Sequence, residues 1–451
     1  MSSPKAFREI PRADHQYRSI GQRKHDFLEV EVPITREESR VQASRCLNCG
    51  IPFCHGVGCP LGNLIPDINR AVARGQWRRA WELLAQRSPF PEFTSRLCPA
   101  LCEGSCTEGI DYHPVAVRQI ERNVVDYAWE NGLVSPCPPK ERSGRRAAVI
   151  GSGPAGLAAA YQLNRHGDTV TVYEKNQEPG GLLRYGIPDF KLSKKIVSRR
   201  IQLLQDEGIQ FVCATEIGSD AAAEYIARTN DRLVFATGTP IARDLDIEGR
   251  NLSGIYLALD FLTSQNRVVG HECKKCTISA QGLRVLVIGG GDTGSDCVGT
   301  AIRQGARAVE QIEIMPRPPI HRSESTPWPM WPWQLRTSSS HEEGCLRRWS
   351  LESLRFIGRE GRVTGVEVVP VVWKYNDVGR PVSFERRGEG ETIDCDLVLL
   401  ALGFLKRTRQ EQLSDFGVHE AENIAFVGDA AHGPSLVVRA IADGLQVGLS
   451  H

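Results

Sequence analysis

The sequence lacks the features that mark membrane-spanning and exported proteins. It contains no stretch of about 18 uncharged apolar residues, and no charged segment followed by an apolar one begins at Met1. The first absence argues against a transmembrane helix, and the second argues against a secretory leader. We therefore expect a soluble, cytoplasmic protein that does not use a membrane as a partner.

Neither sign of charge is in excess. The 451 residues carry 55 Lys and Arg against 54 Asp and Glu, so no overall field favours nucleic acid or an acidic membrane surface. Low-complexity tracts and short-period repeats are absent as well. At about 150 residues per domain, the length predicts roughly three domains.

Cysteine, in contrast, is plentiful and unevenly distributed. Seven of the 14 cysteines fall within about sixty residues, in the runs C-x2-C-x4-C-x4-C and C-x3-C-x3-C. They are Cys46, Cys49, Cys54, Cys59, Cys98, Cys102 and Cys106. In a large chain without an export signal, such clustering indicates metal ligation rather than disulfides. Closely spaced thiolates hold iron-sulfur clusters, and seven of them give one full set and leave a second set a ligand short.

Structural zinc is the alternative interpretation of these cysteines. It uses four thiolates, or three thiolates and an imidazole, and His55 and His113 lie nearby in the sequence. The segment around the cysteines, residues 35–132, is polar with helical periodicity, for example over residues 64–84. We expect a small helical domain that is built around something other than a large apolar core.

A first glycine-rich motif follows a Pro- and Arg-rich linker, residues 136–146, and a short apolar run, residues 147–150. It reads G-x-G-x-x-G from Gly151 to Gly156 and leads into an apolar helix. Such glycines allow a tight turn, approach of a pyrophosphate and close helix packing, and the phosphate lies at the helix N-terminus. The next strand ends in Glu174, 23 residues after Gly151, which is placed to bind ribose hydroxyls.

A second copy of this pattern begins at residues 284–288, with a glycine loop from Gly289 to Gly294. The following strand, residues 311–315, ends in Pro316-Arg317 rather than in an acid. Because arginine suits a 2′-phosphate and an acid suits NAD, the sequence favours NADPH over NADH. Arg322 is a second candidate for that phosphate, within a Pro- and Trp-rich stretch, residues 316–333, that we expect to be irregular.

Further strands and loops complete the two units. One strand ends at Gly238 and its counterpart at Gly403, so one nucleotide domain is interrupted by the other. A strand at residues 424–427 leads into Gly428-Asp429, and an Asp there can accept a hydrogen bond from the ribityl chain of a flavin. The glycine-rich loop at residues 180–188 is placed to run close to the same ligand.

Taken together, these motifs resemble the small (beta) subunit of bacterial NADPH-dependent glutamate synthase over essentially the whole chain. The likeness rests on the cysteine block and on residues 149–156, 180–191 and 289–294, in that order. The N-terminal part of dihydropyrimidine dehydrogenase is similar to the same module.

The resemblance implies two 4Fe-4S clusters with crossed ligation. One cluster would be held by Cys46, Cys49, Cys54 and Cys106. The other would be held by Cys59, Cys98 and Cys102, with Glu121 in the place of the missing ligand.

The resemblance also implies an α/β fold with two Rossmann-like nucleotide-binding domains, similar to adrenodoxin reductase, behind a small helical iron-sulfur domain. The helical domain would span residues 1–140. The FAD domain would be discontinuous, at 145–240 and 395–451, with the NADPH domain inserted at 241–394. The candidate cofactor-binding residues are Gly151, Gly153, Pro154, Ala155, Gly156, Glu174, Lys175, Gly181, Leu182, Arg184, Gly186, Gly238, Gly289, Gly291, Asp292, Thr293, Gly294, Arg317, Arg322, Gly403, Gly428 and Asp429.

The implied activity is oxidation of NADPH at FAD and electron transfer through the clusters to a large (alpha) subunit that makes glutamate from glutamine and 2-oxoglutarate. We expect no catalytic acid or base, because hydride transfer of this kind depends on positioning. One alternative is a free-standing reductase for ferredoxin, sulfide or a small organic acceptor. Another is a non-catalytic, zinc-stabilised scaffold with degenerate nucleotide folds.

Overall fold

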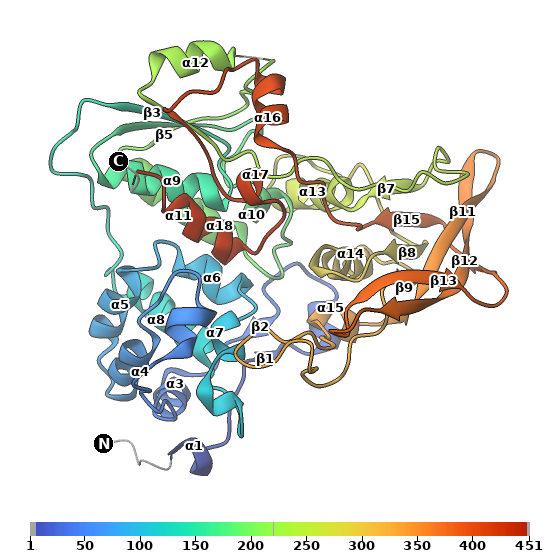
Figure 1. Cartoon of the computed structure of the whole chain (residues 1–451), viewed down its shortest axis with the longest axis horizontal. Coiled ribbons are helices and arrows are strands. Elements are labelled where there is room, and N and C mark those ends of the chain that lie inside the picture. The colour runs from blue at the N-terminus through green and yellow to red at the C-terminus, as the bar shows by residue number, and fades with distance from the viewer. Residues whose placement is uncertain (1–5, 220, 449–451) are drawn as a thin grey trace.

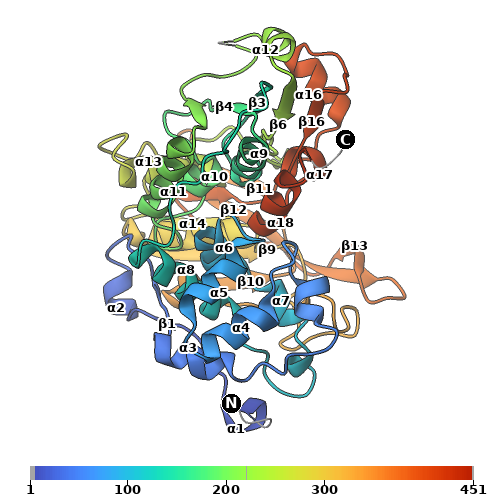
Figure 2. The same ribbon diagram turned by 90° about the vertical axis from the view of Figure 1, so that its left-hand side faces the viewer.

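The computed structural model describes residues 6–219 and 221–448 (Figure 1). The outermost residues of the expected domains, 1–5 and 449–451, and residue 220 lie outside the described residues. Helices near the N-terminus form one part of the molecule, and two parallel sheets with their helices, together with an antiparallel sheet, form the rest, as Figure 2 shows from the side. The expected α/β class is confirmed. Among the described residues, no helix combines the length and the apolar character needed to cross a bilayer.

The helical part surrounds the cysteine runs. A short apolar core that includes Ile68, Leu84 and Ile120 holds its helices together. The helix expected over residues 64–84 is divided in two by Gly75, whose φ of 71° ends the first helix. The elements are α1 (Ala6–Glu9), β1 (Gln16–Tyr17), α2 (Ile20–Arg23), β2 (Glu31–Val32), α3 (Arg36–Ala43), η1 (Cys54–Gly58), α4 (Ile65–Ala73), α5 (Trp77–Ala85), α6 (Pro91–Leu97), α7 (Leu101–Gly104), η2 (Thr107–Gly109) and α8 (Val117–Glu130).

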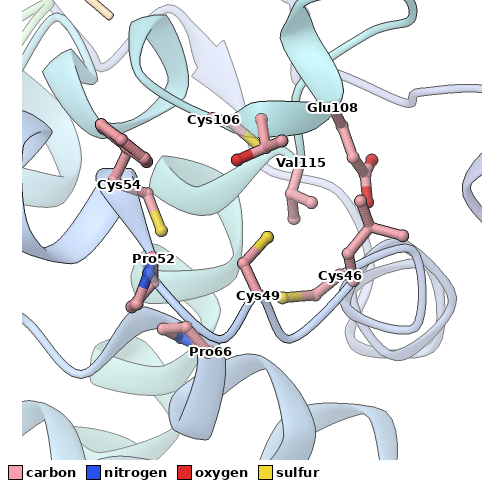
Figure 3. Close-up of a pocket in the computed structure, with 11 residues that line it drawn as sticks. Cys46, Cys49, Pro52, Cys54, Pro66, Cys106, Glu108 and Val115 are labelled. Carbon is pink, nitrogen blue, oxygen red and sulfur yellow. The ribbon is translucent and has the colours of Figure 1, made fainter.

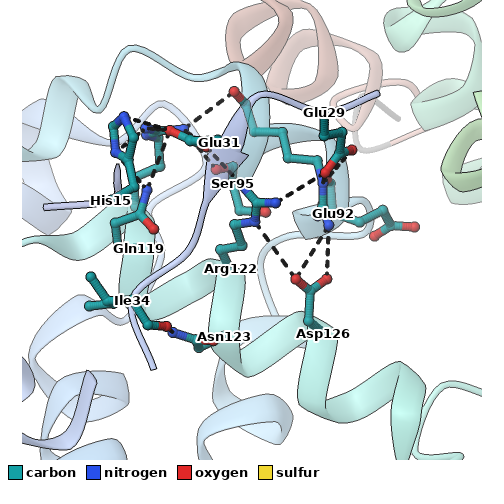
Figure 4. A network of polar contacts seen from close by, with 12 residues as sticks. His15, Glu29, Glu31, Ile34, Glu92, Ser95, Gln119, Arg122, Asn123 and Asp126 are labelled. Carbon is teal, nitrogen blue, oxygen red and sulfur yellow. Dashed lines mark hydrogen bonds and ion pairs between the residues drawn. The ribbon is translucent and has the colours of Figure 1, made fainter. Parts of the chain in front are cut away.

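Ion pairs tie the N-terminal segment to the helices of this part (Figure 4). The guanidinium of Arg122 on α8 donates to Glu31 at 2.7 Å and to Glu29 at 3.0 Å. Arg96 on α6 reaches Glu29 and Asp126, at 3.1 Å each. Because the arginines are almost fully buried, each carboxylate offsets a charge that is costly to remove from water.

The first parallel sheet has the strand order β16-β6-β3-β4-β5. Its strands are β3 (Arg146–Ile150), β4 (Thr169–Tyr173), β5 (Gln210–Val212), β6 (Arg232–Phe235) and β16 (Ile424–Phe426). Its helices are α9 (Pro154–Arg165), α10 (Leu182–Tyr185), α11 (Lys194–Asp206), α12 (Ala223–Thr229), α16 (Arg409–Phe416), α17 (Asp429–His432) and α18 (Val437–Gly444). The buried pair of Arg200 on α11 and Glu92 on α6, at 2.6 Å, joins this unit to the helical part.

The second parallel sheet has the order β10-β9-β8-β15-β7. Its strands are β7 (Ile255–Leu257), β8 (Arg284–Ile288), β9 (Ala308–Glu313), β10 (Cys345–Trp349) and β15 (Leu397–Leu400), and its helices are α13 (Ala258–Val269), α14 (Asp292–Arg303) and α15 (Ser339–Glu342). The expected resumption of the first unit at residue 395 is therefore wrong for β15. This strand pairs with β7 on one edge and β8 on the other, and its four apolar residues are all buried, as is typical of a central strand whose two faces are covered.

A four-stranded antiparallel sheet follows β10 and projects from the second unit (Figure 1). It consists of β11 (Leu351–Arg359), β12 (Arg362–Tyr375), β13 (Pro381–Arg386) and β14 (Glu391–Asp394). This sheet was not predicted from the sequence. The Pro- and Trp-rich stretch at residues 316–333 contains no helix or strand, as expected.

Candidate cofactor and cluster sites

The first glycine loop connects β3 to α9 at the carboxyl end of the first sheet. Gly151 has a φ of 101°, and a side chain there would meet the carbonyl oxygen of Ala236 at 2.5 Å. A Cβ on Gly156 would lie 1.9 Å from the carbonyl oxygen of Gly151, so the close approach of α9 requires glycine. Gly153, in contrast, has no atom within 4 Å of such a Cβ. Two glycines are thus demanded by the fold, and the third leaves open space where a phosphate can approach.

Glu174 closes this loop from the end of β4. Its carboxylate accepts hydrogen bonds from the Ser152 hydroxyl at 2.5 Å and the Ser152 backbone N–H at 3.2 Å. The other oxygen accepts from the backbone N–H of Asn176 at 2.9 Å. The strand-end acid therefore lies beside the glycine turn, where ribose hydroxyls of a bound nucleotide are recognised.

Segments from the end of the chain surround the start of α9. A Cβ on Gly428 would lie 2.5 Å from the Cβ of Ala155, and one on Gly444 would lie 2.3 Å from the Ala155 carbonyl oxygen. Asp429 opens α17 here and accepts a hydrogen bond from the Ser435 hydroxyl at 2.6 Å, while burial raises its pKa. Figures 1 and 2 both show α9, α17 and α18 side by side.

The remaining candidates near the first loop differ in their surroundings. Pro154 forms the first turn of α9, and a Cβ on Gly181 would lie only 2.7 Å from the Cα of Gly153. Lys175 and Leu182 are exposed. The buried guanidinium of Arg184 donates to the Pro179 carbonyl at 2.8 Å and the Ser198 hydroxyl at 2.9 Å, which are the contacts of a loop-bracing residue. Gly186 ends α10.

The second glycine loop repeats this construction between β8 and α14. A Cβ on Gly289, whose φ is 122°, would lie 2.2 Å from the carbonyl oxygen of Ala401, and Gly294 packs against the Gly289 carbonyl in the same way. Gly291 again has no atom within 4 Å of such a Cβ. Asp292 and Thr293 begin α14. Gly238 and Gly403, which follow β6 and β15, have φ values of 69° and 82° and also face open space.

An acid at this second loop was not predicted from the sequence. Strand β9 ends at Glu313 and not at residue 315, and the Glu313 carboxylate accepts a hydrogen bond from the Gly290 backbone N–H at 2.5 Å. Its other oxygen accepts from the Met315 backbone N–H at 3.1 Å. Glu313 thus occupies the place that Glu174 occupies in the first unit. The spacing from Gly289, 24 residues, was the signal that could have identified it.

A chain of hydrogen bonds holds the second loop from behind. The Gln311 amide donates to the Gly289 carbonyl at 2.7 Å, and its oxygen lies 2.8 Å from Nε2 of His341. Nδ1 of His341 accepts from the backbone N–H of Ser338 at 3.2 Å, so the neutral ring donates from Nε2. Burial, reinforced by the charges of Arg347 and Lys191, lowers the pKa of His341 to about 4.

The two arginines predicted to bind a 2′-phosphate have different environments. Arg322 donates to the backbone carbonyls of Thr326, Met330 and Gly104 at 3.0, 2.6 and 2.8 Å. It therefore fastens the irregular stretch to the helical part, which differs from the predicted phosphate role. Arg317 is exposed, and its guanidinium lies over the ring of Trp349.

Four of the cysteines face one pocket in the helical part (Figure 3). They are Cys46, Cys49, Cys54 and Cys106. Burial, reinforced by the nearby thiols of Cys106, Cys46 and Cys49, raises the pKa of the Cys54 thiol to about 12. The four thiols therefore lie together in a place where the loss of a thiol proton is costly unless a cation binds the thiolates.

The other three cysteines face a second pocket together with Glu121. The lining includes Cys59, Cys98, Cys102, Glu121 and also Val438 of α18. Glu121 accepts a hydrogen bond from the Asn63 side chain at 2.9 Å, and burial raises its pKa to about 7. Among the described residues, no three metal-binding side chains converge on the position of a single ion.

The structure therefore divides the predicted ligands into the two sets that the resemblance implied. Neither pocket is lined by His55 or His113, the two histidines that were considered as ligands in the zinc alternative. The ring of His55 instead contacts the carbonyl of Asn63 at 2.8 Å.

Two family descriptions match the two parts of the chain. Residues 23–133 match dihydropyrimidine dehydrogenase domain II, 4Fe-4S cluster, and residues 145–327 match pyridine nucleotide-disulphide oxidoreductase. The solved structure of Mycobacterium tuberculosis FprA in complex with NADPH superposes with a TM-score of 0.52. At 18% identity, over 67% of this chain and 83% of FprA, that likeness confirms the fold alone.

Relatives of known name cover nearly the whole chain. The glutamate synthase [NADPH] small chain of Mycobacterium tuberculosis is 46% identical, over 95% of this chain and 90% of its own length. That of Bacillus subtilis is 39% identical, over 99% and 97%. The glutamate synthase [NADH] of Schizosaccharomyces pombe is 42% identical over 98% of this chain, which spans 22% of that longer protein. The predicted resemblance is thus confirmed, and the chain belongs to the glutamate synthase small chain family.

Proposed function

We propose that this chain is an NADPH-dependent flavin and iron-sulfur oxidoreductase subunit that supplies electrons to a glutamate-forming large subunit. The observation that carries the proposal is the arrangement of two open glycine loops and two cysteine-lined pockets, one of which touches the first nucleotide unit. The 4Fe-4S and oxidoreductase family matches agree with this arrangement.

The first loop would hold FAD. The backbone from Gly151 to Gly156 offers a helix N-terminus and open space for the pyrophosphate, and Glu174 would bind the ribose. Asp429 lies next to the start of α9, where the ribityl chain of a flavin would pass. When bound, FAD accepts a hydride and releases electrons singly, which no side chain of this protein can do.

The second loop would hold the dinucleotide NADPH in the same manner, at Gly289, Gly291 and Gly294. No side chain is required to move a proton, so the contribution of the protein is to orient the nicotinamide and flavin rings and to exclude water.

The positions of the two pockets suggest an order for the two 4Fe-4S clusters. The second pocket includes Val438 of α18, which packs against α9 of the first nucleotide unit. The first pocket lies in the loop that carries the exposed side chains of Leu47, Ile51 and Val57. The inner cluster, nearer to the flavin unit, would therefore be held by Cys59, Cys98, Cys102 and Glu121, and the outer cluster by Cys46, Cys49, Cys54 and Cys106. Such clusters would supply one-electron transfer.

The large (alpha) subunit is the partner that we propose, in the cytoplasm, with glutamine and 2-oxoglutarate as its substrates. The Schizosaccharomyces pombe relative supports it, because a segment like this chain forms part of one longer glutamate synthase there. A free-standing reductase with another acceptor is the alternative, and it shares every step up to the outer cluster.

The test is analysis of iron, acid-labile sulfide and flavin in protein purified without oxygen, followed by an NADPH titration. We expect flavin, about eight iron atoms per chain and bleaching of the flavin absorbance by NADPH. Protein that contained zinc without iron, or no flavin, would overturn the proposal. Added large subunit should then produce glutamine-dependent NADPH oxidation, whereas its absence would favour the free-standing reductase.

A further inference from the structure

Two arginines lie over the ring of one tryptophan at the edge of the second sheet. The guanidinium carbon of Arg347 lies 4.9 Å from the ring centroid of Trp349, and that of Arg317 lies 5.3 Å from it. Trp349 ends β10, and its register partner in the parallel pairing is Glu313, the last residue of β9. The arginine pair therefore lies at the carboxyl edge of the sheet, next to the strand end that contacts the second glycine loop.

Neither arginine has its charge neutralised by the protein. Within residues 6–219 and 221–448, no carboxylate forms an ion pair with either, and Arg347 donates only to the Arg336 carbonyl, at 3.1 Å. Burial and the charge of Arg317 lower the pKa of Arg347. Arg348, the next residue of the same strand, instead pairs with Glu310 and Glu391. Like charges held together without an acid are unfavourable unless an anion binds them.

Glu313 does not supply that anion. One of its oxygens accepts the Gly290 N–H and the other the Met315 N–H, so its carboxylate braces the loop. An acid at this place ordinarily marks a site for NAD. Here the arginine pair offers hydrogen-bond donors for an additional phosphate group, which NADPH has and NADH lacks.

We propose that Arg317 and Arg347, ordered by Trp349, bind the 2′-phosphate of NADPH and thereby determine the preference for NADPH over NADH. The inference rests on the proposed function and assigns Arg347 and Trp349 as specificity-determining residues of its second nucleotide site. The guanidinium group suits this task because its planar donors match two phosphate oxygens at once. The indole ring attracts both cations and fixes their planes.

The test compares binding of 2′,5′-ADP and of ADP to the purified holoprotein by calorimetry. Wild type should bind 2′,5′-ADP more tightly, and Arg347→Gln should weaken that binding about tenfold to a hundredfold while affinity for ADP is retained. Arg317→Gln should act in the same direction. Arg348→Gln is the matched control and should leave the affinities for both probes at their wild-type values.

The outcomes separate this inference from the proposed function. If wild type binds both probes equally, or if Arg347→Gln weakens both equally, the arginine pair does not recognise the 2′-phosphate and the inference fails. A flavin that neither NADPH nor NADH can reduce would instead overturn the proposed function. Far-ultraviolet circular dichroism of each variant shows whether it has folded, and Arg347→Lys provides a milder variant should Arg347→Gln not fold.

Discussion

The ammonium group of Lys191 lies 2.5 Å from the carboxylate of Asp296. Lys191 follows α10 of the first nucleotide unit, and Asp296 lies on α14, the helix that begins at the second glycine loop. This ion pair therefore joins the two units. The Asp296 side chain is 9% exposed, so its charge depends on this partner.

Removal of one member of this pair should destabilise the protein more than removal of both. Lys191→Met leaves the Asp296 carboxylate buried without its ion-pair partner, and we expect the free energy of unfolding to fall by about 3 kcal/mol. The double variant with Asp296→Asn should recover most of that loss, because no buried charge remains. Thermal unfolding of the two single variants and the double variant measures the coupling. Additive effects of the two substitutions would show that the pair does not join the units.

Substitution of the central glycine in each loop should impair the binding of a different nucleotide. Gly153 and Gly291 both have φ values that any residue adopts, −67° and −79°, and space around a Cβ. Gly153→Ala should therefore fold, but its affinity for flavin should fall about tenfold or more, since the methyl group occupies the path of the pyrophosphate. Gly291→Ala should retain flavin and lose reduction by NADPH. Flavin absorbance of the purified variants is the measurement. Equal flavin loss in both variants would contradict the assignment of the loops.

Substitutions in the two cysteine pockets should act on separate clusters. Cys49→Ser and Cys98→Ser should each remove about half of the iron, because each pocket would hold one of two clusters. The exposed Cys137 offers a control, and Cys137→Ser should leave the iron content unchanged. Iron and sulfide analysis, together with electron paramagnetic resonance of the reduced protein, distinguishes the two spectra. A variant in the first pocket that lost all iron would show that the pockets do not load independently.

The stability of the protein should fall in acid partly because of His341. Its pKa is about 4 in the folded chain against an ordinary value of 6.5, so the unfolded chain binds a proton in this window that the folded chain does not. Stability from this group is therefore complete above pH 6.5 and declines as the pH falls towards 4. We expect the free energy of unfolding to fall by about 1 to 2 kcal/mol through this group, after allowance for its partial exposure to solvent.

Unfolding temperatures measured between pH 7.5 and 4.5, a range of about three units around this window, should show the effect of His341. The unfolding temperature should change less steeply with pH in His341→Gln than in wild type. The exposed His321 is the control, and His321→Gln should retain the wild-type slope. A His341→Gln variant with the wild-type pH dependence would refute this assignment.

The glycine loops could be predicted from sequence because their requirements are local. Gly151 and Gly289 turn the chain within a few residues of a strand, and the residues that need space are their own neighbours. The predicted division of the cysteines into two sets came from the resemblance, since spacing alone does not reveal that Cys106 faces the same pocket as Cys46.

Other features depend on pairing between distant segments, which a single sequence does not reveal. The place of β15 between β7 and β8 follows from hydrogen bonds to strands more than a hundred residues away. The contact of Arg347 with Trp349 and Arg317 likewise depends on β10 joining the edge of the second sheet. The antiparallel sheet from β11 to β14 escaped prediction because its strands carry no motif.

The lining of the two pockets implies an order of biosynthesis. The first pocket is complete once the ribosome has synthesised the chain as far as Val115. The second includes Val438, so its wall is incomplete until α18 has been synthesised. A nascent chain would thus be able to receive the proposed outer cluster early, whereas the proposed inner one would stay accessible to cellular thiols and oxygen until α18 packs over it.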